Sequence, residues 1–335
     1  MGRSVTIGIP VYKRLHCLPQ ALQSVTKQDY SDIELLVSDN GLNGTKVRQI
    51  VDEWYSRPYR FRQNSVTVNV ADHYNQLIQE ANGRYFVTLD DDDTISPNFI
   101  SELVGILEDN PHVAIAMGQQ QVVDASGRFL QQSSVDVPDF LTCEEFVRSW
   151  TKYGFANYTT FLTRTKDIRA CGGFPDYPRG YHIEDAVILK LCLGRSIAFS
   201  KRCTFYLCRS DSSMSASMGY EDRAVATSRF LTFLDSNPEI LDYQRTQPEL
   251  WGELKNIMAT MTWRTYLHHL ESLNKQKMSM FQWAKAACAL PLIPDYYRAV
   301  RSLLFGAARE AIGTRAKRLL PWAYKIYKAM KSSTT

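Results

Sequence analysis

Four consecutive carboxylates, the acidic tetrad of Asp90, Asp91, Asp92 and Asp93, follow a short apolar run of β-strand type. Neighbouring like charges repel one another, and alternate side chains of an extended chain point to the same side. We therefore expect Asp90 and Asp92 to converge on a cation. Carboxylate oxygens suit Mg²⁺ or Mn²⁺, which take one or two protein carboxylates and complete their coordination with water and phosphate oxygens. The tetrad predicts a metal ion and a nucleotide diphosphate.

The tetrad has two other interpretations. An EF-hand calcium loop needs Gly at its sixth position and Glu at its twelfth, where this chain has Ile95 and Ser101, so that site is excluded. A solvated acidic turn that caps a helix beginning near Pro97 is the simpler alternative, because Asp is favoured at helix N-termini.

The elements that must position the tetrad belong to a repeating strand and helix pattern over the first 118 residues. The strand candidates are residues 5–10, 33–38, 59–62, 84–89 and 113–117. Helical spacing of apolar residues fills the segments between them, at 15–25, 47–54, 74–81 and 100–107. This alternation predicts an α/β fold with a Rossmann-like, mainly parallel sheet flanked by helices.

Polar residues follow three of the expected strands. Tyr12, Lys13 and Arg14 follow the first, Asp39 the second and the acidic tetrad the fourth. Open sheets of this kind bind ligands beyond the carboxyl ends of their strands, so we expect these side chains to share one site.

Beyond residue 118 the alternation weakens. Residues 119–139 are polar and predict a loop or hairpin that lines a pocket, and residues 171–175 predict a turn. Helices are expected at residues 143–153 and 184–193 and from residue 221 onward. We therefore predict three parts: a nucleotide-binding and catalytic domain at 1–220, a helical region at 221–295 and a basic amphipathic tail at 296–335.

Composition places the chain among globular proteins, since 335 residues with 44% apolar content can bury a large core. The seven cysteines form no C-x-x-C pair, which indicates neither a zinc site nor a disulfide framework and fits a reducing cytosol. The chain shows neither a signal-peptide pattern nor an apolar run of about 20 residues, so we expect it to be neither secreted nor transmembrane.

The tail at residues 296–335 holds nine Lys or Arg against one acidic residue, a net charge of +8 in a chain whose total is +4. Leu, Ile, Trp and Tyr alternate with these bases, as in helices that lie on anionic membrane surfaces. An ordinary packing helix with a basic face and a nucleic-acid contact are the alternatives. We expect a peripheral position on the inner face of the cell membrane and no nucleic-acid partner.

Five segments, taken in order and with their spacing, resemble the family 2 glycosyltransferases, which are inverting nucleotide-sugar enzymes of the GT-A fold. They are residues 7–14, 37–40, 75–93, 172–174 and 184–185. The resemblance covers about residues 4–215 and is of the bacterial surface-polysaccharide type. The remainder of the chain carries no resemblance.

The resemblance implies that Pro10, Tyr12 and Arg14 form part of the nucleotide pocket and that Asp39 contacts the base or ribose. A carboxylate at a strand end can accept hydrogen bonds from a base imide or from ribose hydroxyls, and an aromatic ring can stack on the base. Each residue also has a structural interpretation, because residues 39–41 are a good turn sequence and Tyr12 can simply pack.

In the tetrad, the family's Asp-x-Asp falls on Asp90 and Asp92. The resemblance implies that Asp92 binds the metal and that Asp90 lies nearer the ribose or a metal-bound water. Asp91 is the variable middle position on the nucleotide side, and Asp93 is a supporting or capping residue. The metal, Mn²⁺ or Mg²⁺, would neutralise the pyrophosphate as the bond to the sugar breaks.

Inversion requires one base to deprotonate the acceptor hydroxyl. The family places it in the Glu184-Asp185 pair, and we assign the base to Asp185, because a helix N-terminus keeps a carboxylate ionised. The alternative is that both residues are helix caps. His182 is an acceptor contact or a loop histidine.

Many relatives carry an Arg-x-His segment whose histidine helps to hold the metal, whereas this chain has Arg209 and Asp211 at those positions. Asp211 could bind the metal and Arg209 a phosphate. The same segment, with its serines, could instead form a lid over the donor.

Other classes fit less well. The segment after the first strand lacks the Gly-rich loop that opens a sugar nucleotidyltransferase, a dehydrogenase or a P-loop NTPase. An inactive nucleotide-sugar-binding or membrane scaffold of the same fold remains open. The sequence predicts a hexosyltransferase that moves a sugar from a UDP- or dTDP-linked donor to a hydroxyl of a glycan or lipid-linked acceptor in surface polysaccharide synthesis.

Overall fold

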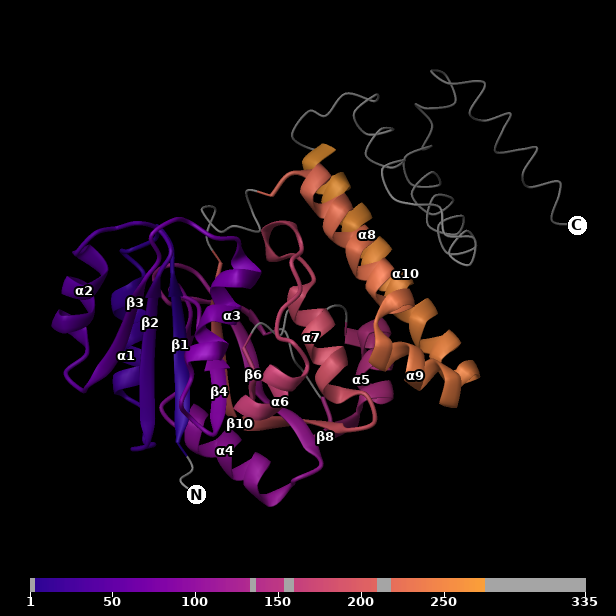
Figure 1. The fold of residues 1–335 in the computed structure, drawn as a ribbon, viewed down its shortest axis with the longest axis horizontal. Coiled ribbons are helices and arrows are strands. Elements are labelled where there is room, and N and C mark those ends of the chain that lie inside the picture. The colour runs from indigo at the N-terminus through magenta and orange to yellow at the C-terminus, as the bar shows by residue number, and fades with distance from the viewer. Residues whose placement is uncertain (1–3, 133–136, 154–159, 210–217, 275–335) are drawn as a thin grey trace, which may run out of the picture.

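A computed structural model describes residues 4–132, 137–153, 160–209 and 218–274. In these residues the strands form one sheet in the order β3-β2-β1-β4-β9-β6-β10-β5, with β7 paired to β6 and β8 to β10 (Figure 1). The strands are β1 Val5–Val11, β2 Ile33–Asp39, β3 Tyr59–Gln63, β4 Tyr85–Thr88, β5 Thr94–Ile95, β6 Val113–Val123, β7 Phe129–Gln132, β8 Phe140–Thr142, β9 Leu162–Arg164 and β10 Ser196–Cys208.

Helices connect and cover these strands. They are α1 Leu18–Thr26, α2 Lys46–Trp54, α3 Val70–Glu80, α4 Phe99–Asp109, α5 Cys143–Tyr153, α6 Thr165–Ala170, α7 Ile183–Cys192, α8 Tyr220–Ser236, α9 Pro238–Thr246 and α10 Pro248–Asn274, with a short 3₁₀ helix, η1, at Pro178–Gly180. The expected helices and strands of the first 118 residues are confirmed, as are the helices near residues 143–153 and 184–193 and the helical pattern after residue 221.

Parallel pairing joins β1 to β2 and β4, β2 to β3, and β6 to β10. The short strands β5, β7, β8 and β9 pair antiparallel with their neighbours. The sheet is therefore mixed, with a parallel core as the sequence predicts.

Strand β6 is longer than the sequence predicts. Its polar end, Gln119 to Val123, pairs with Thr204 to Cys208 of β10, so of the two predictions for residues 119–139, a loop or a hairpin, the hairpin is correct. Backbone pairing to a long neighbouring strand overrides the polar composition here. The expected hairpin exists, because β7 returns antiparallel to the end of β6.

Alternation along β1 explains the two cores. Val5, Ile7 and Ile9 are fully buried in the cluster that includes helices α1, α2 and α4. The residue between them, Gly8, faces α3, where an added Cβ would lie 3.3 Å from Leu77. Helices α3, α5 and α7 cover this second face, since their apolar residues form the other cluster.

Helices α8 and α10 pack outside the second face and run side by side (Figure 1). Phe230 of α8 and Trp251 and Met258 of α10 belong to the same buried cluster as α7 and the sheet. The helical region and the sheet therefore share a core, and the domain boundary near residue 220 stays a prediction. In the part of the chain that the structure describes, no helix combines the length and apolar character needed to cross a bilayer.

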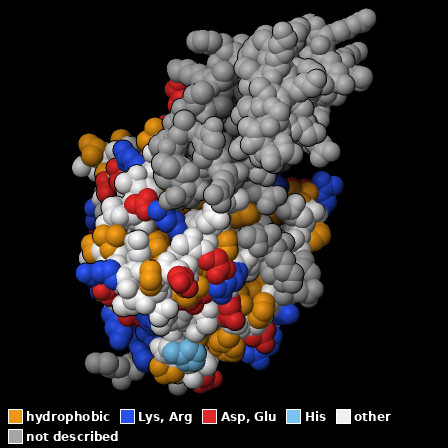
Figure 2. Space-filling model, turned by 90° about the vertical axis from the view of Figure 1, so that its right-hand side faces the viewer, with side chains coloured by type: hydrophobic (Ala, Val, Ile, Leu, Met, Phe, Trp, Pro, Cys, Tyr) orange, Lys and Arg blue, Asp and Glu red, His pale blue; other side chains and the backbone are white. Residues whose placement is uncertain are grey.

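Acidic and basic side chains are intermixed on the face seen in Figure 2. Ion pairs of the outer helices match this distribution: Arg148 Nε lies 2.8 Å from Glu253 Oε1, and Arg245 Nη2 lies 3.0 Å from Asp242 Oδ1. The Arg245 and Asp242 side chains are largely exposed, so this pair contributes little to stability.

Candidate functional site

The acidic tetrad is a turn. The backbone N–H of Asp93 donates to the carbonyl of Asp90 at 3.1 Å, directly after β4. The expectation of an extended segment is therefore wrong. The physical reason is connectivity: β4 pairs with β1 and β9, whereas β5 pairs with β10, so the chain must change direction between them.

Arg14 gathers two carboxylates of the tetrad. Its Nη2 donates to Asp91 Oδ1 and to Asp92 Oδ1, each at 3.1 Å, and its Nη1 donates to Asp92 Oδ2. The backbone N–H of Tyr12 donates to Asp91 Oδ2 at 3.3 Å. The loop after β1 is thus tied to the turn after β4, as expected for residues at the carboxyl ends of neighbouring parallel strands.

Asp90 is held by a residue whose role was missed in the sequence. The Tyr74 hydroxyl of α3 donates to Asp90 Oδ1 at 2.6 Å, and the Tyr74 ring packs edge-on against Phe174 with centroids 5.3 Å apart. Spacing placed Tyr74 on a buried helix face, and a buried tyrosine hydroxyl needs a partner. That requirement is the signal that could have pointed to Asp90.

Asp93 connects the tetrad to β10. It is 2% exposed, and its Oδ1 accepts a hydrogen bond from the backbone N–H of Cys208 at 2.8 Å. Helix α4 begins at Phe99 without a side-chain cap. Since Asp91 is also 2% exposed, the interpretation of the tetrad as a solvated helix cap is wrong.

Burial governs the electrostatics of the tetrad. It raises the pKa of Asp90 to about 6 and the pKa of Asp91 to about 7, with repulsion from Asp92 adding to both. The pKa values of Asp92 and Asp93 are also raised, chiefly by burial. Arg14 acts in the opposite direction on all four carboxyls. One guanidinium does not neutralise four carboxylates, so the remaining negative charge favours either protonation of the turn or a further cation.

A divalent metal fits these donors. Within the described ranges no three His, Cys, Asp or Glu side chains are arranged to hold a metal ion by themselves. Mg²⁺ and Mn²⁺ do not need such a cage, because one or two carboxylates and substrate phosphates suffice. Asp90 and Asp92 offer hard oxygen donors of this kind. Asp211 lies outside the described residues, so its assignment as a ligand stays a prediction.

Tyr12 is the exposed aromatic residue beside the tetrad. Its side chain is 48% exposed, while its carbonyl accepts a hydrogen bond from Asn43 Nδ2 at 2.5 Å. The backbone is therefore fixed and the ring is open to solvent, an arrangement suited to stacking on a base. Pro10 lies within β1, two residues before Tyr12.

Asp39 holds the loop after β2. It is fully buried, and it accepts hydrogen bonds from Gly41 N at 2.9 Å, Asn43 N at 3.0 Å and Gln63 Nε2 at 3.2 Å. These contacts agree with the turn that residues 39–41 predict. A contact of Asp39 with the nucleotide stays a prediction.

Glu184 and Asp185 begin helix α7 and make different contacts. Burial, followed by the negative charges of Asp185 and Asp90, raises the pKa of Glu184 to about 8. Glu184 and Asp90 both also raise the pKa of the buried Tyr74 hydroxyl, which donates to Asp90. Asp185 Oδ2 lies 2.7 Å from His182 Nδ1. The fold therefore brings the acidic pair of α7 and the tetrad, which are about 90 residues apart in sequence, to one region.

The expected turn at residues 171–175 supports this arrangement. Gly172 and Gly173 have φ angles of +78° and +65°, which favour glycine. Asn75 Nδ2 donates to the Phe174 carbonyl and Asn75 Oδ1 accepts from the Phe174 N–H, both at 2.8 Å. Lys190 of α7 donates to the Gly173 carbonyl at 2.7 Å. The turn thus links α3, which carries Tyr74, to α7.

Arg209 follows β10, and its backbone N–H donates to the Val123 carbonyl at 2.8 Å. Its predicted phosphate contact stays a prediction, and the serines that follow it lie outside the described residues.

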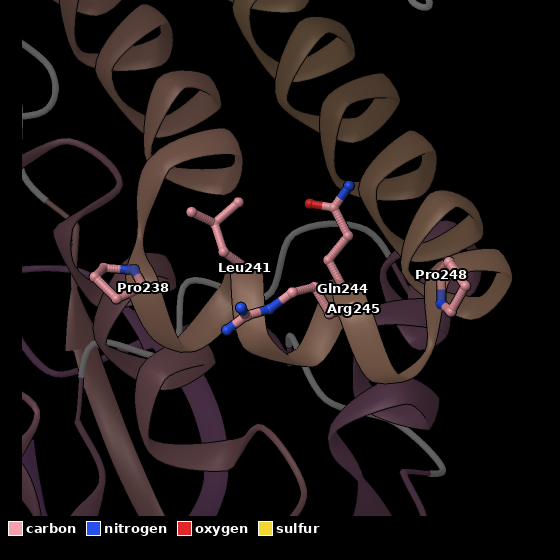
Figure 3. Close-up of a pocket in the computed structure, with 5 residues that line it drawn as sticks. All are labelled: Pro238, Leu241, Gln244, Arg245 and Pro248. Atoms are coloured by element: carbon pink, nitrogen blue, oxygen red, sulfur yellow. The ribbon is translucent and has the colours of Figure 1, made fainter.

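A hollow of about 600 Å³ lies elsewhere, on α9 and the start of α10. Its lining residues are Pro238, Leu241, Gln244, Arg245 and Pro248 (Figure 3). The polar groups of these side chains are one amide and one guanidinium, with no carboxylate, thiol or imidazole, so we do not assign the chemistry to this hollow.

Residues 6–173, about half of the chain, match the profile of Glycosyl transferase family 2. The chain belongs to this family. The matched residues carry Tyr12, Arg14, the tetrad and the glycine turn, and the helix with Glu184 and Asp185 begins at Ile183, after the short 3₁₀ helix η1.

Curated relatives of this glycosyl transferase family 2 chain are similar over part of their length. An N-acetylglucosaminyltransferase of Sinorhizobium fredii is 28% identical over 155 residues, which are 45% of this chain and 37% of the relative. The abequosyltransferase RfbV of Salmonella typhimurium is 29% identical over 31% of this chain and 32% of its own length. The alignments thus span about a third of these relatives.

Solved structures share the fold over most of the chain. S. aureus TarS 1–349 in complex with UDP-GlcNAc has a TM-score of 0.64 at 16% identity and covers 89% of this chain and 81% of that one. The mannosyltransferase PcManGT from Pyrobaculum calidifontis, in complex with GDP-Man and Mn²⁺, has a TM-score of 0.54 at 16% identity and covers 98% of this chain and 87% of that one. The α/β architecture with its C-terminal helices is therefore that of GT-A glycosyltransferases.

Proposed function

We propose that this chain is a metal-dependent, inverting glycosyltransferase. It transfers a hexose from a nucleotide-diphosphate sugar, with UDP or dTDP as the nucleotide, to a hydroxyl of a glycan or lipid-linked saccharide in surface polysaccharide synthesis. The observation that carries the proposal is the connection between the two acidic groups. Helix α3, whose Tyr74 donates to Asp90, is joined through Asn75 to the turn that Lys190 of α7 also contacts, and α7 carries Glu184 and Asp185. Membership of glycosyl transferase family 2 supports it.

The loops after β1 and β4 would hold the donor. Tyr12 presents its exposed ring for the base, and Arg14 fixes Asp91 and Asp92. Asp90, oriented by Tyr74, and Asp92 would hold Mn²⁺ or Mg²⁺. When bound, the metal would stabilise the negative charge that develops on the leaving diphosphate. PcManGT, which is similar in fold, was solved with GDP-Man and Mn²⁺, in line with a divalent ion here.

Asp185 would act as the base. It takes the proton of the acceptor hydroxyl while that oxygen forms a bond to the anomeric carbon. The bond between this carbon and the diphosphate oxygen breaks at the same time, and the nucleotide diphosphate leaves with the electron pair. One in-line displacement of this kind inverts the configuration.

Glu184 is the less suitable base at neutral pH. Burial raises its pKa to about 8, which disfavours the ionised form that a general base needs. Both residues stand in the first turn of α7, where the helix dipole favours a carboxylate, and Asp185 in addition contacts His182 Nδ1 at 2.7 Å. We therefore assign the proton transfer to Asp185 and a hydrogen-bonding role to Glu184.

The test of the donor site is a thermal melt with Mn²⁺ and a panel of UDP-, dTDP-, GDP- and CDP-sugars. A ligand that binds only the native state stabilises it and so raises the melting temperature. At a hundredfold excess over the dissociation constant, the free energy of unfolding increases by about 2.7 kcal/mol. We expect a metal-dependent rise with the UDP- or dTDP-sugars. The rise should be lost in Asp92→Asn and retained in Asp242→Asn, whose exposed carboxylate lies on α9.

If no nucleotide sugar raises the melting temperature with or without Mn²⁺, the donor site is refuted. A rise without transfer to any acceptor would favour the inactive scaffold of the same fold.

A lipid-linked acceptor would place the protein at a membrane surface. Residues 296–335 lie outside the described residues, and their net charge of +8 with interspersed aromatic residues supports binding to anionic lipid headgroups. The full chain should co-float with phosphatidylglycerol vesicles and not with phosphatidylcholine vesicles. Deletion of residues 296–335 should abolish this binding, and unchanged binding of the truncated chain would refute the peripheral location.

A further inference from the structure

His182 makes a direct contact with the residue proposed as base. Its Nδ1 lies 2.7 Å from Asp185 Oδ2, one turn away at the start of α7. The His182 residue is 5% exposed, and the Asp185 side chain is 18% exposed. An ionised carboxylate can only accept hydrogen bonds, so the contact requires a proton on His182 Nδ1.

The backbone of His182 is unusual for a residue with a Cβ. Its φ of 69° and ψ of 10° place it in the left-handed region at the N-cap of α7. Residues there usually cap the helix through a short polar side chain, yet the His182 side chain makes no capping hydrogen bond. Uncommon backbone conformations of this kind cluster at functional sites. Helix capping therefore does not explain this histidine.

Aromatic packing fixes the plane of the imidazole. The ring stacks on Phe230 of α8 with centroids 5.1 Å apart and an interplanar angle of 19°, and it lies against Tyr181 with centroids 4.1 Å apart. Phe230 is fully buried, and Arg223 of α8 lies over the Tyr181 ring at 5.0 Å. Helix α8, which lies after the residues that match the family profile, thus orients the imidazole.

We propose that His182 is a positioning residue for Asp185. The imidazole donates its Nδ1 proton to Oδ2 and keeps that proton throughout the reaction, so that Oδ1 of Asp185 is the oxygen that receives the acceptor proton. The aromatic stack with Phe230 makes helix α8 part of the catalytic apparatus. This inference rests on the proposed function, in which Asp185 is the base.

Two substitutions separate the hydrogen bond from the packing. His182→Phe keeps a ring to stack on Phe230 but has no donor for Asp185. His182→Asn loses the ring but tolerates the left-handed backbone and carries an amide N–H near the position of Nδ1. His112→Phe is the matched control, because His112 is exposed.

Misplacement of a catalytic group by about 1 Å can cost on the order of 100-fold in rate, so we expect His182→Phe to lower kcat by about 100-fold. The donor KM should stay near wild type, because the donor site is unchanged. The melting temperature should fall, because phenylalanine adopts the left-handed backbone less readily than histidine and the hydrogen bond to Asp185 is lost. His182→Asn should recover at least about a tenth of the wild-type kcat despite a lower melting temperature. A His182→Phe enzyme with wild-type kcat, or a His182→Asn enzyme as slow as His182→Phe, would overturn the proposal.

A spectroscopic measurement tests the contact without turnover. In protein labelled with ¹⁵N-histidine, one of the six histidines should show a protonated Nδ1 whose shift changes in Asp185→Asn and not in Asp242→Asn. If the wild type transfers no sugar but this signal is present, the proposed function fails while the contact stands. If no histidine signal responds to Asp185→Asn, the positioning role is refuted.

Discussion

Two sets of adjacent carboxylates approach the same edge of the sheet and are held in different ways. The acidic tetrad is held by charge and hydrogen bonds from Arg14, Tyr74 and the backbone of β10. The pair on α7 lies in the first turn of that helix. There, Asp185 contacts His182, whose backbone is in the left-handed region and whose ring stacks on Phe230 of α8. The first arrangement concentrates negative charge and suits a metal and a diphosphate. The second isolates one carboxylate and suits proton transfer.

The comparison predicts that removing the base Asp185 lowers kcat and leaves the affinity for the donor unchanged. Asp185→Asn should lower kcat by about 10³-fold, since general base catalysis contributes about 10² to 10⁴. Donor affinity should stay within about twofold, because the substitution leaves the tetrad untouched. Steady-state kinetics with the donor identified by melting measures both, with Asp242→Asn as the control. Turnover near wild type would move the base to another residue.

Removing the Arg14 guanidinium should destabilise the folded protein as well as lower its activity. Arg14→Met leaves Asp91 and Asp92 without their guanidinium, and breaking a largely buried pair costs about 3 kcal/mol. Urea unfolding without metal measures this free energy, and Mn²⁺ should restore part of it. Arg245→Met is the matched control, because its pair with Asp242 is exposed and should contribute less than about 1 kcal/mol. Equal effects of the two substitutions would mean that Arg14 does not stabilise the tetrad.

The free energy of unfolding should fall at acidic pH, because His73, which lies against Ser38 of β2, is buried in its neutral form. Burial lowers the pKa of His73 to about 4, where its Nε2 lies 2.9 Å from Ser38 Oγ next to Asp39. The unfolded chain binds this proton near pH 6.5, so the contribution of the neutral imidazole is present above pH 6.5 and is lost as the pH falls toward 4. The loss is roughly 3 kcal/mol.

His73→Gln should therefore show a smaller loss of stability between pH 7 and pH 4 than the wild type, as measured by urea unfolding at each pH. His112→Gln, at an exposed site, should follow the wild type. Parallel pH profiles for His73→Gln and the wild type would contradict the assignment.

The hydrogen bond of Tyr74 should have a smaller effect that is confined to the donor side. Tyr74→Phe removes the donor to Asp90, which should lower the free energy of unfolding by about 1 kcal/mol and weaken Mn²⁺-dependent donor binding. Tyr59→Phe is the control, because its hydroxyl bonds to Asp52 at an exposed site. A loss of kcat in Tyr74→Phe without any change in donor binding would contradict the division between the two carboxylate sets.

The donor side was largely predictable from the sequence, because local patterns determine it. Apolar alternation identified β1, β2 and β4, and the polar residues after each strand had to meet at one edge. Proximity of Arg14 and the tetrad followed from this topology. The turn geometry of the tetrad did not, since it depends on the antiparallel pairing of the two-residue strand β5 with β10.

The α7 side was less predictable, because it depends on contacts between distant segments. The sequence marked Glu184 and Asp185 through a resemblance, and it left His182 as an acceptor contact or a loop residue. No spacing rule connects His182 with Phe230, which lies 48 positions later on a helix outside the sheet. Similarly, the end of β6 has a polar composition, and only its pairing with β10 makes it a strand.

The most direct test of the central claim is a calorimetric titration in which UDP, or the nucleotide selected by the melting panel, is added with Mn²⁺ to the wild type, Asp92→Asn and Asp185→Asn. The account predicts that Asp92→Asn loses most of the affinity and that Asp185→Asn keeps it, because the tetrad holds the donor and the α7 pair acts on the acceptor. Equal affinity in all three proteins, or loss in Asp185→Asn alone, would contradict the assignment of the two carboxylate sets.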